Sequence, residues 1–123
     1  MRENAAGGEK PLHWIGSALK DIRRFPQPVQ RTAGFALSAA QHDGKHPSAK
    51  PWKGEGPGLL EVVTDFDGDT YRAVYTVRFA RAVYVLHAFQ KKSPHGIATR
   101  QSDVELVRAR LKIAAEHYAE RYG

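Results

Sequence analysis

The fold is decided by residues 59–76, which read LLEVVTDFDGDTYRAVYT, and by residues 84–93, which read YVLHAFQKKS. Runs of valine, tyrosine and threonine bounded by glycine and aspartate are typical of β-strands. The Asp-Gly pair at residues 67–68 favours a tight turn between two such strands. The pattern predicts a three-stranded antiparallel meander, which the chain enters through a loop at residues 42–58.

Two helices are predicted before the meander. Ser17 is a candidate N-cap for the first helix, and Pro26 must end it because proline lacks an amide hydrogen and clashes with the preceding turn. Pro28 fits the first turn of the second helix, and Gly44 stops that helix. The apolar face of the second helix consists of Val29, Ala33, Ala36, Leu37 and Ala40.

A closing amphipathic helix is predicted after the meander, because Ser102 and Glu105 have the spacing of a capping box. Its apolar face consists of Val104, Val107, Leu111, Ala114 and Tyr118. A short apolar run at residues 11–15 predicts an opening strand. The order β-α-α-β-β-β-α indicates an α+β fold, a twisted antiparallel sheet with an N-terminal helical hairpin and a C-terminal helix. We expect residues 1–9 to be a flexible leader and residues 10–123 to form one domain.

Composition indicates an anionic partner. The 123-residue chain carries a net charge of +6, and residues 72–112 hold nine basic side chains against only Asp103 and Glu105. Such a surface attracts phosphate polymers and acidic proteins by the same physics. The chain has no cysteine, so disulfides and thiolate chemistry are excluded. We expect a cytoplasmic protein with no membrane partner, since the sequence has neither a secretory signal nor an apolar run of about 20 residues.

Metal and serine-nucleophile chemistry have little support in the sequence. The six histidines are scattered over different predicted elements, and none belongs to a His-Glu-x-x-His motif. His42 and His46 could share a loop site, but no supporting acids stand at ligand spacing. Neither a Gly-x-Ser-x-Gly elbow nor a Walker-type phosphate loop occurs. The sequence therefore predicts no metal and no cofactor.

A set of basic side chains gives the stronger candidate site. It comprises Lys53, Arg72, His87, Lys91 and Lys92, which neighbouring strands can bring onto one face. RNA cleavage without a metal needs a base for the 2'-hydroxyl proton, cations for the phosphorane and an acid for the leaving oxygen. These residue types can supply all three. The sequence also leaves open that the lysines are solvated surface charges, that Glu61 pairs with one cation, and that His87 is a half-buried structural histidine.

The same segments resemble the RelE/HigB superfamily of toxins, and most of all its phage-related HigB branch. The resemblance covers about residues 14–115. Its most specific parts are the Gly-Asp-Thr-Tyr-Arg turn at residues 68–72 and the Phe-Gln-Lys-Lys-Ser ending at residues 89–93. It implies the toxin of a type II toxin-antitoxin system, a ribosome-dependent mRNA endonuclease. It also implies a cognate antitoxin, typically a helix-turn-helix protein, so that DNA would be contacted only through the toxin-antitoxin complex.

The resemblance also implies roles for individual residues. Arg72 matches the arginine of the family's Tyr-Arg turn, Lys91 and Lys92 match the basic pair after the last strand, and Lys53 matches a basic residue before the meander. These cations would stabilise the transition state, while Lys53 or His87 would transfer protons. The chain departs from the family at Val63, where relatives usually carry an arginine.

Two other functions remain open at the level of sequence. One is a non-catalytic inhibitor that binds a protein target such as gyrase, because a shared fold does not fix the function. The other is a basic RNA-binding module that has lost its enzymatic activity, which the missing arginine at Val63 favours.

Overall fold

The computed structural model describes residues 8–91 and 99–123. Its elements are β1 (Leu12–Trp14), α1 (Ala18–Ile22), α2 (Gln27–Gln41), β2 (Ala49–Pro51), β3 (Leu59–Phe66), β4 (Asp69–Thr76), β5 (Val83–Lys91) and α3 (Gln101–Tyr122). The predicted α+β class is confirmed. Most of the predicted leader, and Lys92 of the candidate site, lie outside the described residues. None of the helices in the described ranges is long and apolar enough to cross a membrane.

The sheet has five strands in the order β1-β5-β4-β3-β2. The predicted antiparallel meander is confirmed as β3, β4 and β5, and β1 adds to it in parallel beside β5. β2 pairs antiparallel with β3 inside the segment predicted to be a loop. This three-residue strand contains a lysine and a proline and shows no alternation, so its pairing comes from tertiary contact. Pro51 is tolerated because β2 is an edge strand.

The β3–β4 hairpin follows directly from its turn residues. Phe66 pairs with Asp69, so the loop consists of Asp67 and Gly68 alone. Both have positive φ angles, 51° and 85°. A two-residue loop with this geometry matches the right-handed twist of the strands, which is why Asp-Gly is favoured there.

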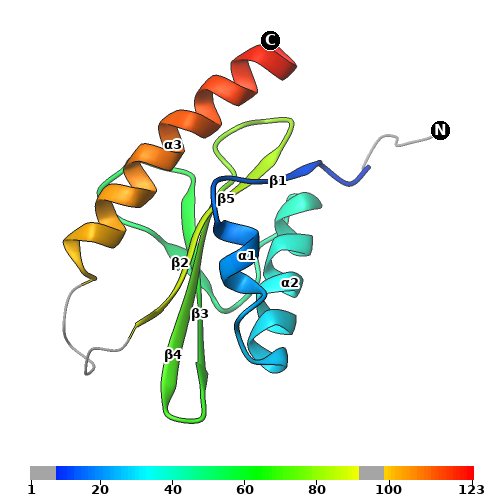
Figure 1. Cartoon of the computed structure of the whole chain (residues 1–123). Helices are drawn as coiled ribbons and strands as arrows, with labels where there is room; N and C mark the ends of the chain where they lie inside the picture. The colour runs from blue at the N-terminus through cyan, green and yellow to red at the C-terminus, as the bar shows by residue number, and fades with distance from the viewer. Residues whose placement is uncertain (1–7, 92–98) are drawn as a thin grey trace.

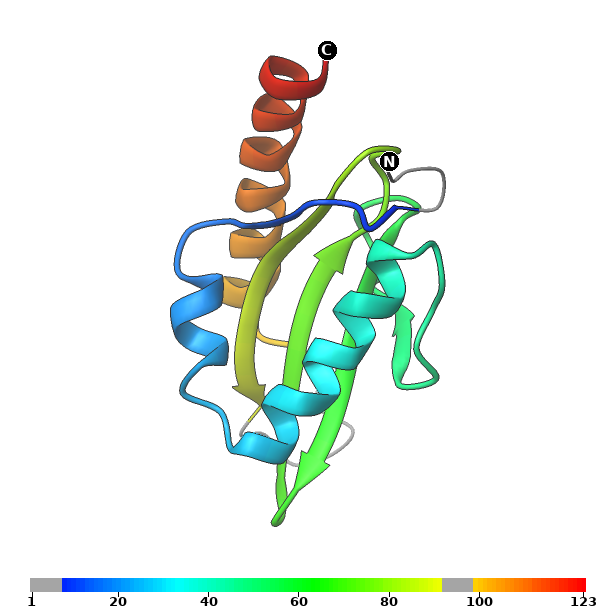
Figure 2. The same cartoon turned by 90° about the vertical axis from the view of Figure 1, so that its right-hand side faces the viewer.

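Helices cover both faces of the sheet. Figure 1 shows α1 and α2 on one side and α3 on the other, and Figure 2 views the α1–α2 side with α3 behind the sheet. The predicted apolar face of α2 is buried in full, and in α3 Val107, Leu111 and Ala114 are buried while Val104 and Tyr118 pack partly exposed. The sheet therefore separates two apolar clusters, one under each helical layer.

The N-terminal caps of α1 and α3 differ from the sequence prediction. Ser17 is the N-cap residue of α1, but its hydroxyl donates to the carboxylate of Asp21 at 2.7 Å and caps no amide. The capping box at Ser102 is wrong, because α3 begins at Gln101. Asp103, in the first turn, forms ion pairs with His87 and Arg100 instead.

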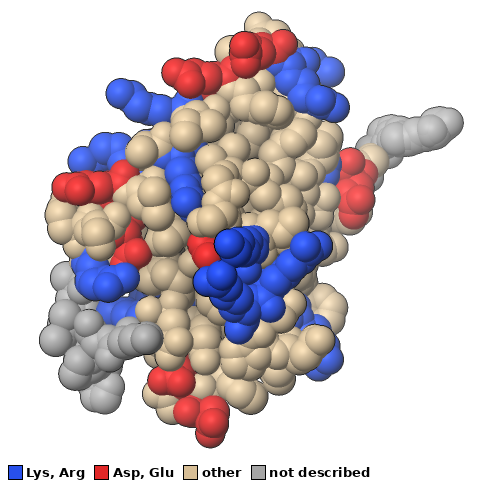
Figure 3. All heavy atoms as spheres, viewed as in Figure 1, with Lys and Arg blue, Asp and Glu red and all other residues tan. Residues whose placement is uncertain are grey.

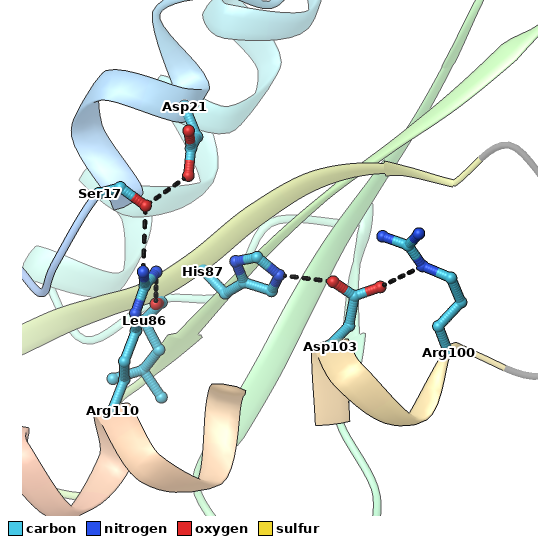
Figure 4. Close-up of polar contacts among 7 residues, drawn as sticks. All are labelled: Ser17, Asp21, Leu86, His87, Arg100, Asp103 and Arg110. Carbon is cyan, nitrogen blue, oxygen red and sulfur yellow. Dashed lines mark hydrogen bonds and ion pairs between the residues drawn. The ribbon is translucent and has the colours of Figure 1, made fainter. Parts of the chain in front are cut away.

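A bulge in β5 attaches α3 to the sheet. Val74 pairs with His87 and Tyr75 pairs with Val85, so Leu86 has no opposite residue in β4. The carbonyl of Leu86 accepts a hydrogen bond from Nη1 of Arg110 at 3.0 Å, and Nη2 of Arg110 donates to Oγ of Ser17 at 3.0 Å (Figure 4). Partial burial lowers the pKa of Arg110. Arg110 thus joins α3, β5 and the start of α1.

The first prediction concerns this arginine. Replacing it (Arg110→Leu) leaves the Leu86 carbonyl without its donor, so we expect the free energy of unfolding to fall by about 1–3 kcal/mol. Urea denaturation measures the change. The matched control is Lys112→Leu on the same helix, where the side chain is exposed, and we expect little change there. Equal losses for the two variants would contradict the assigned role of Arg110.

Aromatic and histidine side chains hold the C-terminal part of α3. His13 of β1 is hydrogen-bonded to the hydroxyl of Tyr122 at 2.7 Å, and Tyr84 of β5 is hydrogen-bonded to His117 at 2.6 Å. The rings of His13 and His117 lie 4.7 Å apart. Burial lowers the pKa of His13, and the nearby His117 and Arg121 lower it further.

The second prediction follows from that lowered pKa. The unfolded chain binds a proton at His13 near the ordinary value of 6.5, whereas the folded protein binds it only at lower pH. The contribution of neutral His13 to the free energy of unfolding is therefore present in full above pH 6.5. It is lost as the pH falls below that value. Thermal unfolding from pH 7.5 to 4.5 measures this loss, and the His13→Phe variant, which cannot titrate there, should lose less. A parallel decline in both proteins would rule His13 out as a cause.

Candidate functional site

Three of the predicted site residues, Arg72, His87 and Lys91, lie on the face of the sheet that α3 covers in part, and Lys53 lies in the loop after β2. Strand register forms three rows across this face, with side chains two positions apart along each strand. The rows are Glu61–Val74–His87, Val63–Arg72–Phe89 and Asp65–Thr70–Lys91. Arg72, His87 and Lys91 are thereby brought onto one face, as the sequence predicted.

A cavity of about 670 Å³ opens beside the first row. Its lining includes Lys50, Lys53 and Glu61, together with Trp52, Thr99 and Val104. Lys50 pairs with Glu61 in the β2–β3 register, so it extends that row to the edge of the sheet. Sequence reasoning found Lys53 but missed Lys50, because only the pairing of β2 places Lys50 at the cavity.

Arg72 and Glu61 form an ion pair within this face, as the alternative reading of Glu61 anticipated. Nη1 of Arg72 donates to Oε1 of Glu61, and the two side chains are only 13% and 10% exposed. The buried Nε of Arg72 has no hydrogen-bond partner among the described residues. The guanidinium is therefore positioned by one carboxylate and still has a donor to satisfy.

His87 is more deeply buried than a surface acid or base, with 6% of the residue exposed. Its Nε2 is hydrogen-bonded to Oδ1 of Asp103 at 2.8 Å, and Nε of Arg100 lies 3.2 Å from Oδ2 of the same carboxylate (Figure 4). The ring stacks on Phe89 with centroids 4.8 Å apart. His87 thus connects β5 to the first turn of α3, and its catalytic role stays a prediction.

Asp103 and Arg100 were missed by the sequence analysis as members of this face. Their three-residue spacing suits contact on a helix, yet nothing in that spacing identifies His87 as the shared partner. Asp103 is buried and contacts both His87 and Arg100. The side chain of Arg100 is 71% exposed. The guanidinium of Arg100 is therefore the solvent-exposed end of the series of contacts His87–Asp103–Arg100.

Lys91 ends β5 and is partly exposed, whereas Lys92 lies outside the described residues. Among residues 8–91 and 99–123, no three His, Cys, Asp or Glu side chains gather in a way that could hold a metal ion. Nδ1 of His42 is hydrogen-bonded to the Ser38 carbonyl, and His46 accepts from the Ser48 amide. The chemistry available on this face is consequently that of lysine and arginine cations next to a carboxylate and an imidazole.

The third prediction tests the buried ion pair. Removing one partner, in Glu61→Leu or Arg72→Leu, leaves the other charge uncompensated, so each change should lower the free energy of unfolding by on the order of 3 kcal/mol. The double variant should be closer to the parent than either single variant, since it removes both charges. Urea denaturation of the four proteins gives the coupling. Additive losses would mean that the two side chains do not act as a pair.

Comparison with known proteins places the chain in a family. The model of the family of phage-derived Gp49-like proteins matches residues 20–112, from α1 to α3. The match includes all four described candidate residues, Lys53, Arg72, His87 and Lys91. No curated protein and no solved structure matches significantly. Because the match covers well over half of its length, the chain belongs to the Gp49-like family of phage-derived proteins, a RelE/HigB-like toxin family.

Proposed function

We propose that this protein is the toxin of a type II toxin-antitoxin pair and that it cleaves mRNA on the ribosome. Membership of a toxin family supports the first part. The observation that carries the second part is the set of cations around the cavity of about 670 Å³, where Lys50 and Lys53 line the wall. Arg72 and Lys91 stand on the adjoining rows of the same face. A phosphate backbone is the ligand such a surface favours.

The proposed reaction is an internal transesterification. A base removes the proton of a 2'-hydroxyl, the 2'-oxygen attacks the neighbouring phosphorus, and the bond from phosphorus to the 5'-oxygen breaks as that oxygen is protonated. The products are a cyclic phosphate and a 5'-hydroxyl. Negative charge grows on the phosphorane oxygens, and Arg72, Lys91 and Lys92 would stabilise it. Lys53 or His87 would transfer the protons. None of these steps requires a metal ion.

The position of Arg72 supports its role despite the departure at Val63. Val63 and Arg72 are directly paired in neighbouring strands, so their side chains occupy one row of one face. This row of the sheet therefore carries Arg72, one of the two arginines that the resemblance implies, and lacks the other at Val63.

A second candidate function is RNA binding without cleavage. Two specific observations favour it: Arg72 is already paired with Glu61, and His87 is already hydrogen-bonded to Asp103. In a pure binding protein these pairs would be structural, and the exposed lysines alone would contact phosphates. The two functions differ in whether ribosome-bound message is cut.

The fourth prediction separates catalysis from docking. On saturated ribosomes in a single turnover, the parent should cut the message and leave a cyclic phosphate. Lys91→Ala should slow that step by about 2–4 kcal/mol in the barrier, because only interactions that strengthen in the transition state accelerate it.

The control is Lys112→Ala, an exposed lysine of α3, which should cleave at the parental rate. Should Lys91→Ala also cleave at the parental rate once bound, the cations form a docking surface. Ribosome binding by the parent with no cut message would establish the non-catalytic alternative.

A further inference from the structure

Arg100 is an exposed arginine at the start of α3, and the proposed reaction gives it no role. Its side chain is 71% exposed, against 13% for Arg72. Each of these arginines is hydrogen-bonded to a carboxylate, Arg72 to Glu61 and Arg100 to Asp103. Of the two guanidinium groups, that of Arg100 is therefore the one that a ligand from solvent can reach.

The carboxylate that holds Arg100 is itself fixed. Asp103 is 5% exposed, and its two oxygens accept from two different groups, Nε2 of His87 at 2.8 Å and Nε of Arg100 at 3.2 Å. Because an ionised carboxylate only accepts, Nε2 of His87 carries the hydrogen. The imidazole is in turn buried and stacked on Phe89. Asp103 therefore has little freedom to move, and Figure 4 shows it between His87 and Arg100.

This arrangement leaves the outer edge of the Arg100 guanidinium open to a ligand. Nε is the atom that donates to Asp103, and Nη1 and Nη2 donate to no residue within 8–91 and 99–123. A planar guanidinium can hold two oxygens of one phosphate. A side chain that a carboxylate already holds also loses less freedom when it binds. The Asp103–Arg100 pair thus has the geometry of a prepared phosphate contact.

Arg100 stands next to the cavity of about 670 Å³ but does not line it. Thr99, the preceding residue, and Val104, in the first turn of α3, form part of the cavity wall, and Lys50 and Lys53 belong to the β2 side. An RNA strand with one nucleotide at the cavity would therefore meet Arg100 with a phosphate further along the strand. The phosphate that is cleaved would lie elsewhere on the face.

We infer that Arg100 binds a non-scissile phosphate of the message, and that Asp103, held by His87, is its positioning residue. We rest this role on the proposed function, since RNA must lie on the α3-covered face for the contact to form. A phosphate offers two oxygens to one guanidinium and repeats along the strand, which suits cations on both sides of the cavity, Lys50 and Lys53 on one and Arg100 on the other.

The fifth prediction separates this role from attraction by overall charge. In single-turnover cleavage on ribosomes, Arg100→Ala should raise the half-saturating toxin concentration about tenfold and leave the maximal rate unchanged, because a contact made equally before and in the transition state affects binding alone. Asp103→Asn should also raise that concentration, because one amide oxygen cannot accept from both His87 and Arg100. Overall charge predicts the opposite sign, since Asp103→Asn removes a negative charge.

Matched controls are Lys112→Ala and Glu105→Gln, which remove an exposed cation and an exposed acid from the same helix. Neither should raise the half-saturating concentration. Arg100→Lys keeps the charge but replaces the planar fork by a single ammonium, so it should restore only part of the loss. Urea denaturation checks that each variant is folded. If Asp103→Asn is unfolded, the exposed substitutions Arg100→Ala and Arg100→Lys still test the contact.

A second probe is a fluorescent single-stranded RNA oligonucleotide with 2'-O-methyl groups, which lacks the attacking hydroxyl. Fluorescence anisotropy at several salt concentrations measures its binding. Loss of one phosphate contact in Arg100→Ala should make the slope of log affinity against log salt shallower by about 0.7.

The two assays distinguish failure of this role from failure of the endonuclease function. If a parent that cuts message is matched by Arg100→Ala in both assays, the assignment of Arg100 is wrong and the endonuclease stands. A lower maximal rate at unchanged half-saturation would overturn the non-scissile assignment. If Arg100→Ala changes only the affinity for the antitoxin, the guanidinium binds a protein carboxylate instead. A parent that cuts nothing, yet binds the oligonucleotide with the predicted losses in the variants, would overturn the endonuclease proposal alone.

Discussion

The bulge at Leu86 determines how α3 packs, and the arrangement of the candidate site depends on that packing. One extra residue in β5 turns the side chains of both Leu86 and His87 toward α3. Arg110 takes the carbonyl of Leu86, and Asp103 takes the imidazole. These two contacts are about two helical turns apart, roughly 10 Å along the axis. They fix both the position and the direction of the helix over the sheet.

The start of α3 consequently stands at the cavity. Val104 in its first turn and Thr99 just before it form part of the cavity wall, opposite Lys50 and Lys53 of the β2 region. A shift of the helix by one turn would change that wall. The irregular pairing at the bulge thus affects the shape of the cavity beside the candidate site. Bulges are often found next to functional sites.

Charge is organised differently on the two faces of the sheet. On the α3 face the cations stand beside Glu61 and Asp103, so Arg72 and His87 are oriented by carboxylates before any substrate binds. On the α1–α2 face, basic side chains gather over α1 and the turn after it (Figure 3), where Lys20, Arg23 and Arg24 are exposed, and α2 contains no acidic residue. The first arrangement orients its groups through fixed contacts, whereas the second leaves its cations exposed to solvent.

Local patterns determined the meander, the Asp67-Gly68 turn, the apolar faces of α2 and α3, and the presence of Arg72, His87 and Lys91 on one face. Each of these follows from spacing within a few residues or from strand alternation. Tertiary structure alone decided the parallel pairing of β1, the added strand β2 that places Lys50, the bulge at Leu86, the start of α3 and the pairing of Glu61 with Arg72. These features arise from contacts between residues far apart in the chain, where the gain comes from packing and from satisfying buried polar groups. Propensity and periodicity do not predict such contacts, because they depend only on residues close together in the sequence.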